Sequence, residues 1–130
     1  MTYLLDTHVF VWLVDEVHRI PPHVRDVIRD PDQDVVVSSV SAMEVATKVG
    51  IGKWEEARPL PPVWMERLAD IGAQDLQVTT RHGLLAGSLD WPHRDPFDRL
   101  LAAQALIGNL TFVTADKVFR TMPGLKLLTW

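Results

Sequence analysis

The chain has 130 residues, 47% of them hydrophobic, and a formal charge of −4 from 13 Lys and Arg against 17 Asp and Glu. This length and apolar content predict a single domain over residues 1–130 with a core of its own. The absence of cysteine excludes a disulfide framework and thiolate zinc sites, and it fits a reducing cytoplasm. The acidic balance argues against a protein that coats nucleic acid with a broad basic face. It does not exclude a nuclease, because a metal ion can supply positive charge locally.

Strand patterns and helix patterns alternate along the chain. The N-terminal apolar run is interrupted by Asp6, Thr7 and His8, and no basic residues precede it, so we expect a cytoplasmic protein without signal peptide or membrane span. Apolar and β-branched runs predict strands at 2–6, 34–39, 76–78, 110–116 and 124–130. Helical spacing and start signals predict helices at 8–14, 21–29, 41–49, 62–71, 80–87 and 96–107.

This order of elements predicts an α/β fold with a central parallel sheet. Parallel strands joined by helices are normally covered by helices on both faces. The proline-rich segment 55–62 is too short to separate two domains. In open parallel sheets, ligands bind beyond the carboxyl ends of the strands. We therefore expect a functional site at that edge.

The segment HRDPFDRLLAAQA (93–105) places Asp95 and Asp98 three residues apart at the start of a predicted helix. The residue preferences at the start of a helix are enough to explain both acids. Asp95 is a favoured N-cap residue, Pro96 suits the first helical position, and Asp98 lies in the first turn, where it complements the helix dipole. The segment alone leaves open whether the two acids start a helix or hold a ligand.

Four acids fall at the same predicted edge of the sheet. Asp6 and Asp116 each end a strand, while Glu44 and Asp98 each lie in the first turn of a helix. Local alternatives exist: Ser41 and Glu44 match a capping box, and Asp116 suits the cap of a short helix. Asp6 ends a buried strand, which is costly unless the carboxylate is paired or binds a cation. Because a divalent cation relieves the repulsion among gathered acids, the pattern predicts a metal site.

The ligand types indicate which metal would bind. Carboxylate oxygens, with no cysteine and no histidine pair at zinc-like spacing, favour Mg²⁺ or Mn²⁺. Among the scattered histidines, His8 and His93 flank the acids. Contact with substrate and ordinary packing both remain open for these two rings.

Three other phosphate-binding classes lack their required residues. The phosphate-loop pattern G-x-x-x-x-G-K-[ST] needs glycine at position 47 and serine or threonine at position 54, where the chain has Thr47 and Trp54. The dinucleotide-binding pattern G-x-G-x-x-G is absent. A response-regulator receiver needs paired acids after the first strand and an acceptor aspartate ending a central strand, and neither DTH nor VVSSVS supplies them.

Four segments, in order along the chain, carry a resemblance to a known family. The chain resembles the PIN-domain ribonucleases, and more narrowly the toxin components of VapBC-type toxin–antitoxin pairs. The matching segments are LLDTHVFVW (4–12), SAMEVATKVGIGKW (41–54), HRDPFDRLLAAQA (93–105) and LTFVTAD (110–116). The resemblance implies a Rossmann-like α/β/α sandwich and a Mg²⁺-dependent endoribonuclease.

The resemblance also implies roles for individual residues. One or two Mg²⁺ ions held by Asp6, Asp98 and Asp116 would activate a water and stabilise the leaving oxygen, and Glu44 would position that water. Asp95 would be an accessory acid or a helix cap. The hydroxyl of Thr114 would help to order the site. Four basic residues are candidates for contacts to RNA phosphates, and ordinary surface charge is the alternative for each: Lys48, Lys53, Arg94 and Arg99.

The family resemblance implies two protein partners, an antitoxin whose tail blocks the acidic cleft and a second copy of the chain in a homodimer. Phe10, Trp12 and Leu13, with Trp54 and Trp64, suit such an interface, and core packing is the alternative for each. The rival function is a catalytically silent PIN-fold binding module locked to a partner, and the presence of all four acids weighs against it. The sequence does not identify the RNA.

Overall fold

The computed structural model describes residues 1–130 and contains one five-stranded, fully parallel sheet in the order β3-β2-β1-β4-β5. The predicted α/β fold with a central parallel sheet is therefore confirmed. The strands are β1 (Thr2–Leu5), β2 (Asp34–Ser38), β3 (Gln74–Leu76), β4 (Thr111–Thr114) and β5 (Lys126–Thr129).

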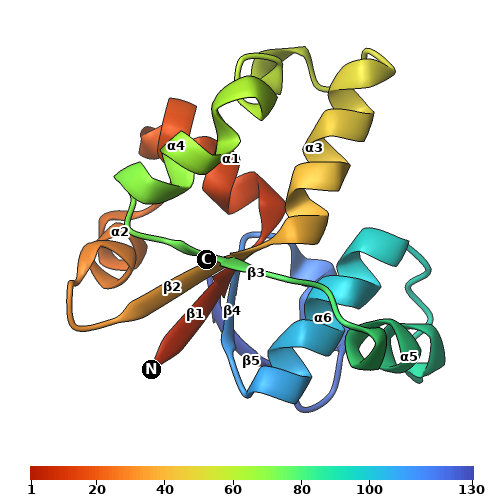
Figure 1. Ribbon diagram of the computed structural model, residues 1–130. Coiled ribbons are helices and arrows are strands. Elements are labelled where there is room, and N and C mark those ends of the chain that lie inside the picture. The colour runs from red at the N-terminus through yellow and green to blue at the C-terminus, as the bar shows by residue number, and fades with distance from the viewer.

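Six α-helices and four short 3-10 turns connect the strands (Figure 1). None of the helices combines the length and apolar character needed to cross a bilayer. The helices are α1 (Thr7–Asp15), α2 (Pro22–Arg29), α3 (Ser39–Gly50), α4 (Trp64–Asp70), α5 (Thr80–Ser88) and α6 (Pro96–Gly108). The 3-10 turns are Val17–Arg19, Glu55–Ala57, Pro61–Val63 and Lys117–Thr121.

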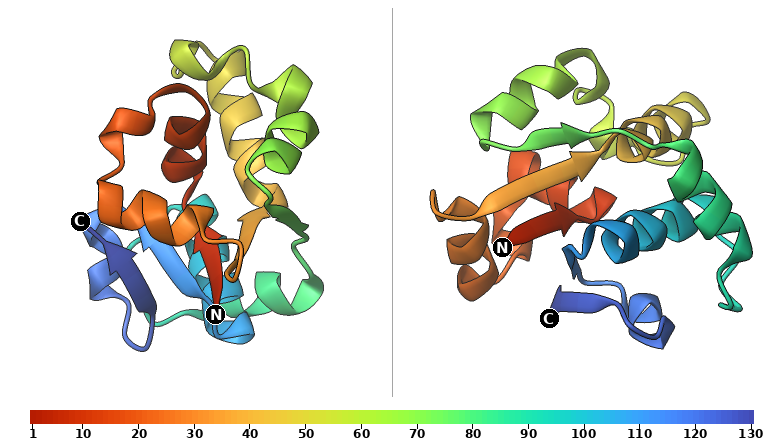
Figure 2. Two further views of the ribbon diagram at one scale, coloured as in Figure 1. Left: turned by 90° about the vertical axis from the view of Figure 1, so that its left-hand side faces the viewer. Right: turned by 60° about the horizontal axis from the view of Figure 1, so that its bottom comes forward.

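Helices cover both faces of the sheet, which gives an α/β/α sandwich (Figures 1 and 2). Successive strand residues point to opposite faces, and β1 shows the consequence. Leu5 packs in a core cluster with residues of α1, α2, α3 and α4, whereas Leu4 packs in a second cluster with α6 and Phe119. Because both faces are buried, the central strands are continuously apolar.

The chain reverses direction across the sheet between β1 and β4. From β1 it runs outward through β2 to β3, then crosses to β4 and continues to β5. The connections leaving the carboxyl ends of β1 and β4 therefore diverge, which opens a crevice at this edge. The residues that follow these two strands are Asp6 and Ala115.

Several predicted elements begin one or two residues away from the observed start, and two of these differences have a clear physical reason. The third strand was predicted at 76–78 but spans Gln74–Leu76, because this edge strand is largely exposed and has no apolar run to mark it. The third helix was predicted to start at Ser41 but starts at Ser39, with Ser38 as N-cap. The predicted capping box of Ser41 and Glu44 is therefore wrong.

Candidate active site

Asp6 lies where β1 passes into α1 and is only 4% exposed. Its Oδ1 accepts a hydrogen bond from the Thr7 backbone N–H at 2.7 Å, and its Oδ2 accepts one from the Thr114 hydroxyl at 2.7 Å. Its own N–H donates to the carbonyl of Val113 at 2.9 Å. Backbone and side chain together thus fix this carboxylate between the two central strands.

Thr114 links two of the predicted acids. While its hydroxyl donates to Asp6, the same oxygen accepts the Asp116 backbone N–H at 2.9 Å. Asp116 is exposed and caps the following 3-10 turn, since its Oδ1 accepts the Val118 N–H at 3.0 Å. Asp6 and Asp116 line one shared cavity of about 220 Å³. The threonine therefore sets the spacing of the acids that follow β1 and β4.

Glu44 is buried on α3, with 3% of its surface exposed. Its Oε2 accepts from Lys48 Nζ at 2.6 Å, one helical turn further on. Ser41, which was expected to cap the helix, instead forms a hydrogen bond with the Thr7 hydroxyl at 2.8 Å. This contact joins α3 to the start of α1, so that Glu44 and Asp6 are held at the same edge.

The two acids of the HRDPFDR segment have different roles. Asp95 Oδ1 accepts the backbone N–H groups of Phe97 and Asp98, at 2.9 and 3.1 Å, so Asp95 caps α6. Asp98 caps nothing: its Oδ2 lies 2.6 Å from Nε2 of His93. The carboxylate in the first turn is therefore oriented by an imidazole, and its second oxygen accepts no hydrogen bond.

Burial and like charge raise the pKa of two of the acids. The pKa of Asp6 rises to about 6, mainly by desolvation, and the charges of Glu44 and Asp116 add to the rise. The pKa of Asp98 also rises to about 6, mainly by desolvation, with further contributions from Asp95, Asp6 and Glu44. The four predicted acids thus act on one another electrostatically, although they come from four separate parts of the chain.

The carboxylates suit a magnesium ion in ligand type. No three Asp, Glu or His side chains lie close enough together to hold one ion among them. Mg²⁺ is commonly bound by one or two carboxylates, with waters and substrate phosphates completing its shell. Asp6, Asp98 and Asp116 offer such oxygens, and a cation would relieve the repulsion that raises the pKa of the first two.

The four basic residues predicted to contact RNA differ in how exposed they are and in whether they already have partners inside the protein. Lys53 and Arg94 are exposed, and Lys48 is half-buried beside Glu44. Arg99 is 6% exposed, and its guanidinium donates to four backbone carbonyls at 2.7–2.9 Å, one in the last turn of α5 and three in the connection from α5 to α6. The prediction that Arg99 contacts phosphate is therefore wrong, because its donors are already used inside the protein.

Two rings beside the acids were given no definite role from the sequence. His8 and Trp12 line the cavity that contains Asp6 and Asp116. Partial burial lowers the pKa of His8. A helix that begins at Asp6 presents positions 8 and 12 on one face, since residues four apart are neighbours. The four-residue spacing of His8 and Trp12 could therefore have indicated from the sequence that both rings lie beside Asp6.

The family model described as PIN domain matches residues 3–125. The chain therefore belongs to the PIN domain family. No curated protein matches it as a relative.

Solved structures with the same fold come from several bacteria. VapBC2 from Rickettsia felis, bound to a DNA fragment from their promoter, is 20% identical with a TM-score of 0.72, and the match covers 100% of this chain and 99% of that one. VapBC-1 from nontypeable Haemophilus influenzae is 20% identical with a TM-score of 0.69, covering 100% and 98%. VapBC-5 from Mycobacterium tuberculosis, of the VapBC family of toxin-antitoxin systems, is 21% identical with a TM-score of 0.61, covering 98% and 96%.

Proposed function

We propose that this protein is the toxin of a VapBC-type toxin–antitoxin pair and acts as a Mg²⁺-dependent endoribonuclease. The observation that carries the proposal is the gathering of four acids from separate parts of the chain at one edge of the sheet: Asp6, Glu44, Asp98 and Asp116. Burial there, with repulsion from the neighbouring acids, raises the pKa of Asp6 and of Asp98 to about 6. Such a concentration of acids, of which only Glu44 has a lysine partner, is unfavourable without a cation. Similarity in fold to VapBC proteins supports the same class.

Asp6, Asp98 and Asp116 would supply ligands to one or two Mg²⁺ ions, with no more than two of the three carboxylates on the same ion. Mn²⁺ is the alternative ion. When bound, Mg²⁺ supplies Lewis acidity toward the scissile phosphate and lowers the pKa of a water. Thr7 and Thr114 hold both oxygens of Asp6 in one orientation, and His93 does the same for one oxygen of Asp98. These hydrogen bonds preorganise the ligands before substrate arrives.

Glu44 is proposed to orient the attacking water. Its Oε2 is occupied by Lys48, which leaves Oε1 to accept a hydrogen bond from a water in the crevice. Lys53 and Arg94 are exposed near the same motifs and are the proposed contacts to RNA phosphates. Asp95 is proposed to act through its cap on α6, which fixes where Asp98 stands.

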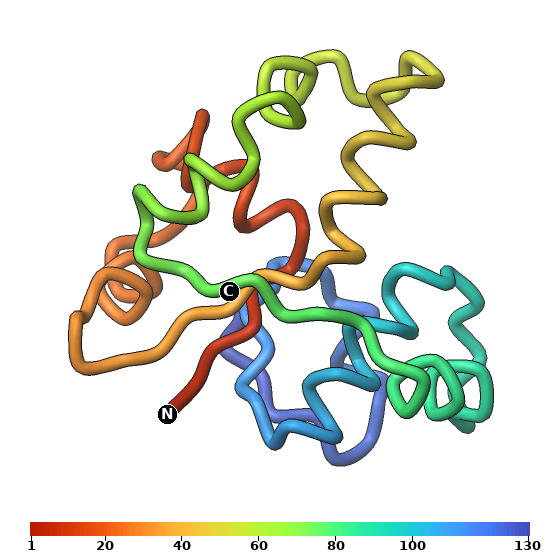
Figure 3. Tube along the Cα trace, in the orientation of Figure 1, coloured from red at the N-terminus to blue at the C-terminus, as the bar shows by residue number.

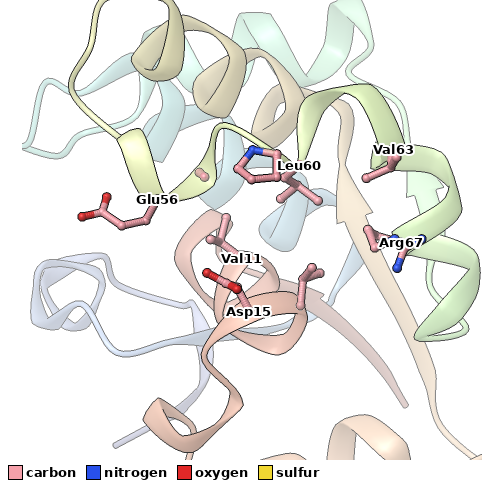
Figure 4. Close-up of a pocket in the computed structure, with 9 residues that line it drawn as sticks. Val11, Asp15, Glu56, Leu60, Val63 and Arg67 are labelled. Atoms are coloured by element: carbon pink, nitrogen blue, oxygen red, sulfur yellow. The ribbon is translucent and has the colours of Figure 1, made fainter.

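The proposed protein partners are a VapB-like antitoxin and, in a homodimer, a second copy of the chain. An apolar cavity of about 210 Å³ lies between α1 and the segment from Glu56 to Arg67 and suits an apolar side chain of the antitoxin. In Figure 4, Val11 and Leu60 point toward one another across this cavity, with Asp15 at its rim. Copurification with the protein encoded beside it, followed by mass measurement of the complex, tests both partners.

An RNA cleavage assay tests the proposed activity. Purified protein should cut single-stranded RNA with Mg²⁺ and stop when EDTA is added. Asp6→Asn and Asp98→Asn should each lower the rate at least ~100-fold, because each removes a charged ligand while keeping its shape. Asp95→Asn should retain most activity, since asparagine caps a helix almost as well as aspartate.

Asp75→Asn is the matched control for these variants, because Asp75 is an exposed aspartate on β3. It should cleave at the wild-type rate. Thermal melts supply a second measurement: Mg²⁺ should raise the melting temperature of wild type more than that of Asp98→Asn, because a ligand stabilises the state that it binds. Absence of RNA cleavage, together with equal Mg²⁺ shifts, would favour the catalytically silent binding module.

A further inference from the structure

The cavity that contains Asp6 and Asp116 has a second wall made of aromatic rings. His8, Trp12 and Ala115 complete its lining, and its volume is about 220 Å³. One wall therefore carries the acids proposed to act at the phosphate, and the other presents flat rings. At 1.5 Å per residue along α1, Trp12 lies only ~9 Å beyond Asp6.

Neighbouring side chains hold both rings in place. The imidazole of His8 packs on Trp54 with ring centroids 4.8 Å apart. The guanidinium of Arg19 lies 4.5 Å from the centre of the Trp12 ring, and Glu16 fixes that guanidinium through a 2.9 Å ion pair. Rings that are ordered before binding lose little conformational entropy when a ligand stacks on them.

The size of the cavity limits what it can hold. Pockets for drug-sized ligands span roughly 300–1,000 Å³, so a cavity of about 220 Å³ suits one planar ring system. Proteins bind unpaired bases by stacking them on Phe, Tyr, Trp and His. A second cavity, of about 150 Å³, also pairs acids with two rings, Trp12 and Trp54, but none of its acids belongs to the proposed metal site. Only the cavity in the crevice joins rings to those acids.

We propose that the cavity is a base-binding subsite, in which one unpaired base of the RNA lies beside the phosphate that is cut and stacks on one of the two rings, His8 or Trp12. The other ring, 6.0 Å away and tilted by 59°, would meet the base at its edge. This inference rests on the proposed endoribonuclease function and deepens it. Stacking tolerates every base, because each has an aromatic face. The subsite therefore distinguishes unpaired from paired bases, and so selects single-stranded RNA. It discriminates little among the four base types.

Cleavage of oligoribonucleotides with single abasic positions tests the subsite. With wild-type protein, removing the base at one position beside the cut should lower kcat/KM by roughly 5- to 150-fold, the range expected for losing one stacked base. Trp12→Leu and His8→Ala should show a similar loss on the intact RNA, mainly in KM. On the abasic RNA they should show little further loss, because the two changes remove the same contact.

Two control variants separate stacking from folding. Trp12→Phe keeps an aromatic ring and should restore most of the base dependence that Trp12→Leu loses. Val14→Ala changes an exposed residue of the same helix outside this cavity and should keep the full abasic effect. The protein is assayed without any partner, so rings that served only a protein interface would leave cleavage unchanged.

Two results would overturn the subsite while leaving the endoribonuclease intact. In the first, Trp12→Leu and His8→Ala cleave intact RNA at the wild-type rate. In the second, removing the base lowers kcat/KM in these two variants as much as it does in wild type. If wild type cuts no RNA, the proposed function itself fails. Binding of intact and abasic oligoribonucleotides to Asp98→Asn, followed by fluorescence anisotropy in Mg²⁺, then decides the subsite separately: equal affinities reject it.

Discussion

At the scale of single residues, the site is built from carboxylates that the fold leaves short of positive charge. Asp6 is almost fully buried, and its two hydrogen bonds lower its pKa less than burial raises it, so that its pKa stands at about 6. Folding thus favours the neutral form of Asp6 relative to the unfolded chain. Burial of a carboxylate that destabilises the fold is typical of functional sites, where stability is lost to keep a group reactive.

This raised pKa predicts how stability depends on pH. The pKa of Asp6 is about 6 in the folded state against an ordinary value of 3.8, so the folded state binds its proton more tightly. The stabilisation is complete below about pH 3.8 and disappears as pH rises through about 6. In EDTA at pH 8, Asp6→Asn should therefore be more stable than wild type by roughly 1 to 3 kcal/mol.

Urea unfolding at pH 4 and pH 8, both in EDTA, measures this effect. At pH 4 the two proteins should differ little, because Asp6 is then mostly protonated in the folded state. Asp75→Asn, on the exposed edge strand, should show no pH-dependent difference from wild type. An Asp6→Asn protein that is less stable than wild type at pH 8 would show that its hydrogen bonds outweigh its burial.

Residue patterns predicted where the acids meet but not how each is held. The edge to which Asp6 and Asp116 belong follows from their places after strands, since parallel strands end at one edge. The partner of Asp98 does not follow from local rules, because the helix start explains Asp98 equally well. Only the folded loop places His93 2.6 Å from that carboxylate. Similarly, only the folded structure shows that Arg99 is just 6% exposed, unlike the surface cations that it resembles in sequence.

At the scale of elements, α5 and α6 form a hairpin whose connecting loop carries His93 (Figure 3). Arg99 holds this loop from inside: its donors reach the carbonyls of Ala86, Leu89, Trp91 and His93. The carbonyls of Trp91 and His93 accept no backbone N–H, so these two depend on the guanidinium, whereas the Leu89 carbonyl also accepts the Trp91 N–H at 2.9 Å. A rigid fork with five N–H donors can satisfy several acceptors at once, which an ammonium group cannot do.

Arg99→Lys should therefore destabilise the protein strongly although charge is conserved. Leaving a buried carbonyl unsatisfied costs about 1–3 kcal/mol, and a lysine cannot reach all four, so we expect a loss of roughly 3 to 5 kcal/mol. Arg94→Lys is the matched control, because Arg94 is an exposed arginine near the start of the same helix, and it should change stability by less than ~0.5 kcal/mol.

Urea unfolding of the three proteins at one pH measures this difference. If Arg99→Lys unfolds within about 1 kcal/mol of wild type, the loop does not depend on the guanidinium, and water must satisfy its carbonyls.

The elements themselves were predictable where a periodic apolar pattern met a clear start or stop signal. The helix α6 begins at Pro96 as predicted and ends one residue later than predicted, at Gly108, because Asp95 and Pro96 mark its start and Asn109 adopts the left-handed conformation after it. The start of α3 was not predictable, since Ser38, Ser39 and Ser41 all suit an N-cap. The tertiary hydrogen bond of Ser41 to Thr7 decides between them.

At the scale of the whole molecule, charge limits how RNA can be bound. The net charge is −4. Because Arg99 is committed to the α5–α6 loop, at most three of the candidate cations remain for phosphate contact: Lys53 and Arg94, which we propose, and Lys48. Lys48 already pairs with Glu44. The proposed binding of RNA cannot then rest on a broad electrostatic surface, and it would come from the proposed metal site and the proposed stacking subsite. The topology supplies both at one place, because β1 ends in the acids and α1 begins with the rings.

The number of cations left for phosphate contact predicts how the binding of RNA depends on salt concentration. For single strands, the logarithm of the binding constant falls against the logarithm of salt concentration with a slope of about −0.7 for each phosphate neutralised. Three contacts predict a slope of about −2 at most, so that raising salt from 50 to 200 mM weakens binding by no more than ~20-fold. Fluorescence anisotropy with Asp98→Asn in EDTA measures this slope without cleavage.

Lys53→Gln should flatten the slope by about 0.7. Lys126→Gln is the matched control, because Lys126 is an exposed lysine on β5, and it should leave the slope unchanged. A slope near −5 would require more cations at the interface than the crevice offers, and would place the RNA on another face of the molecule.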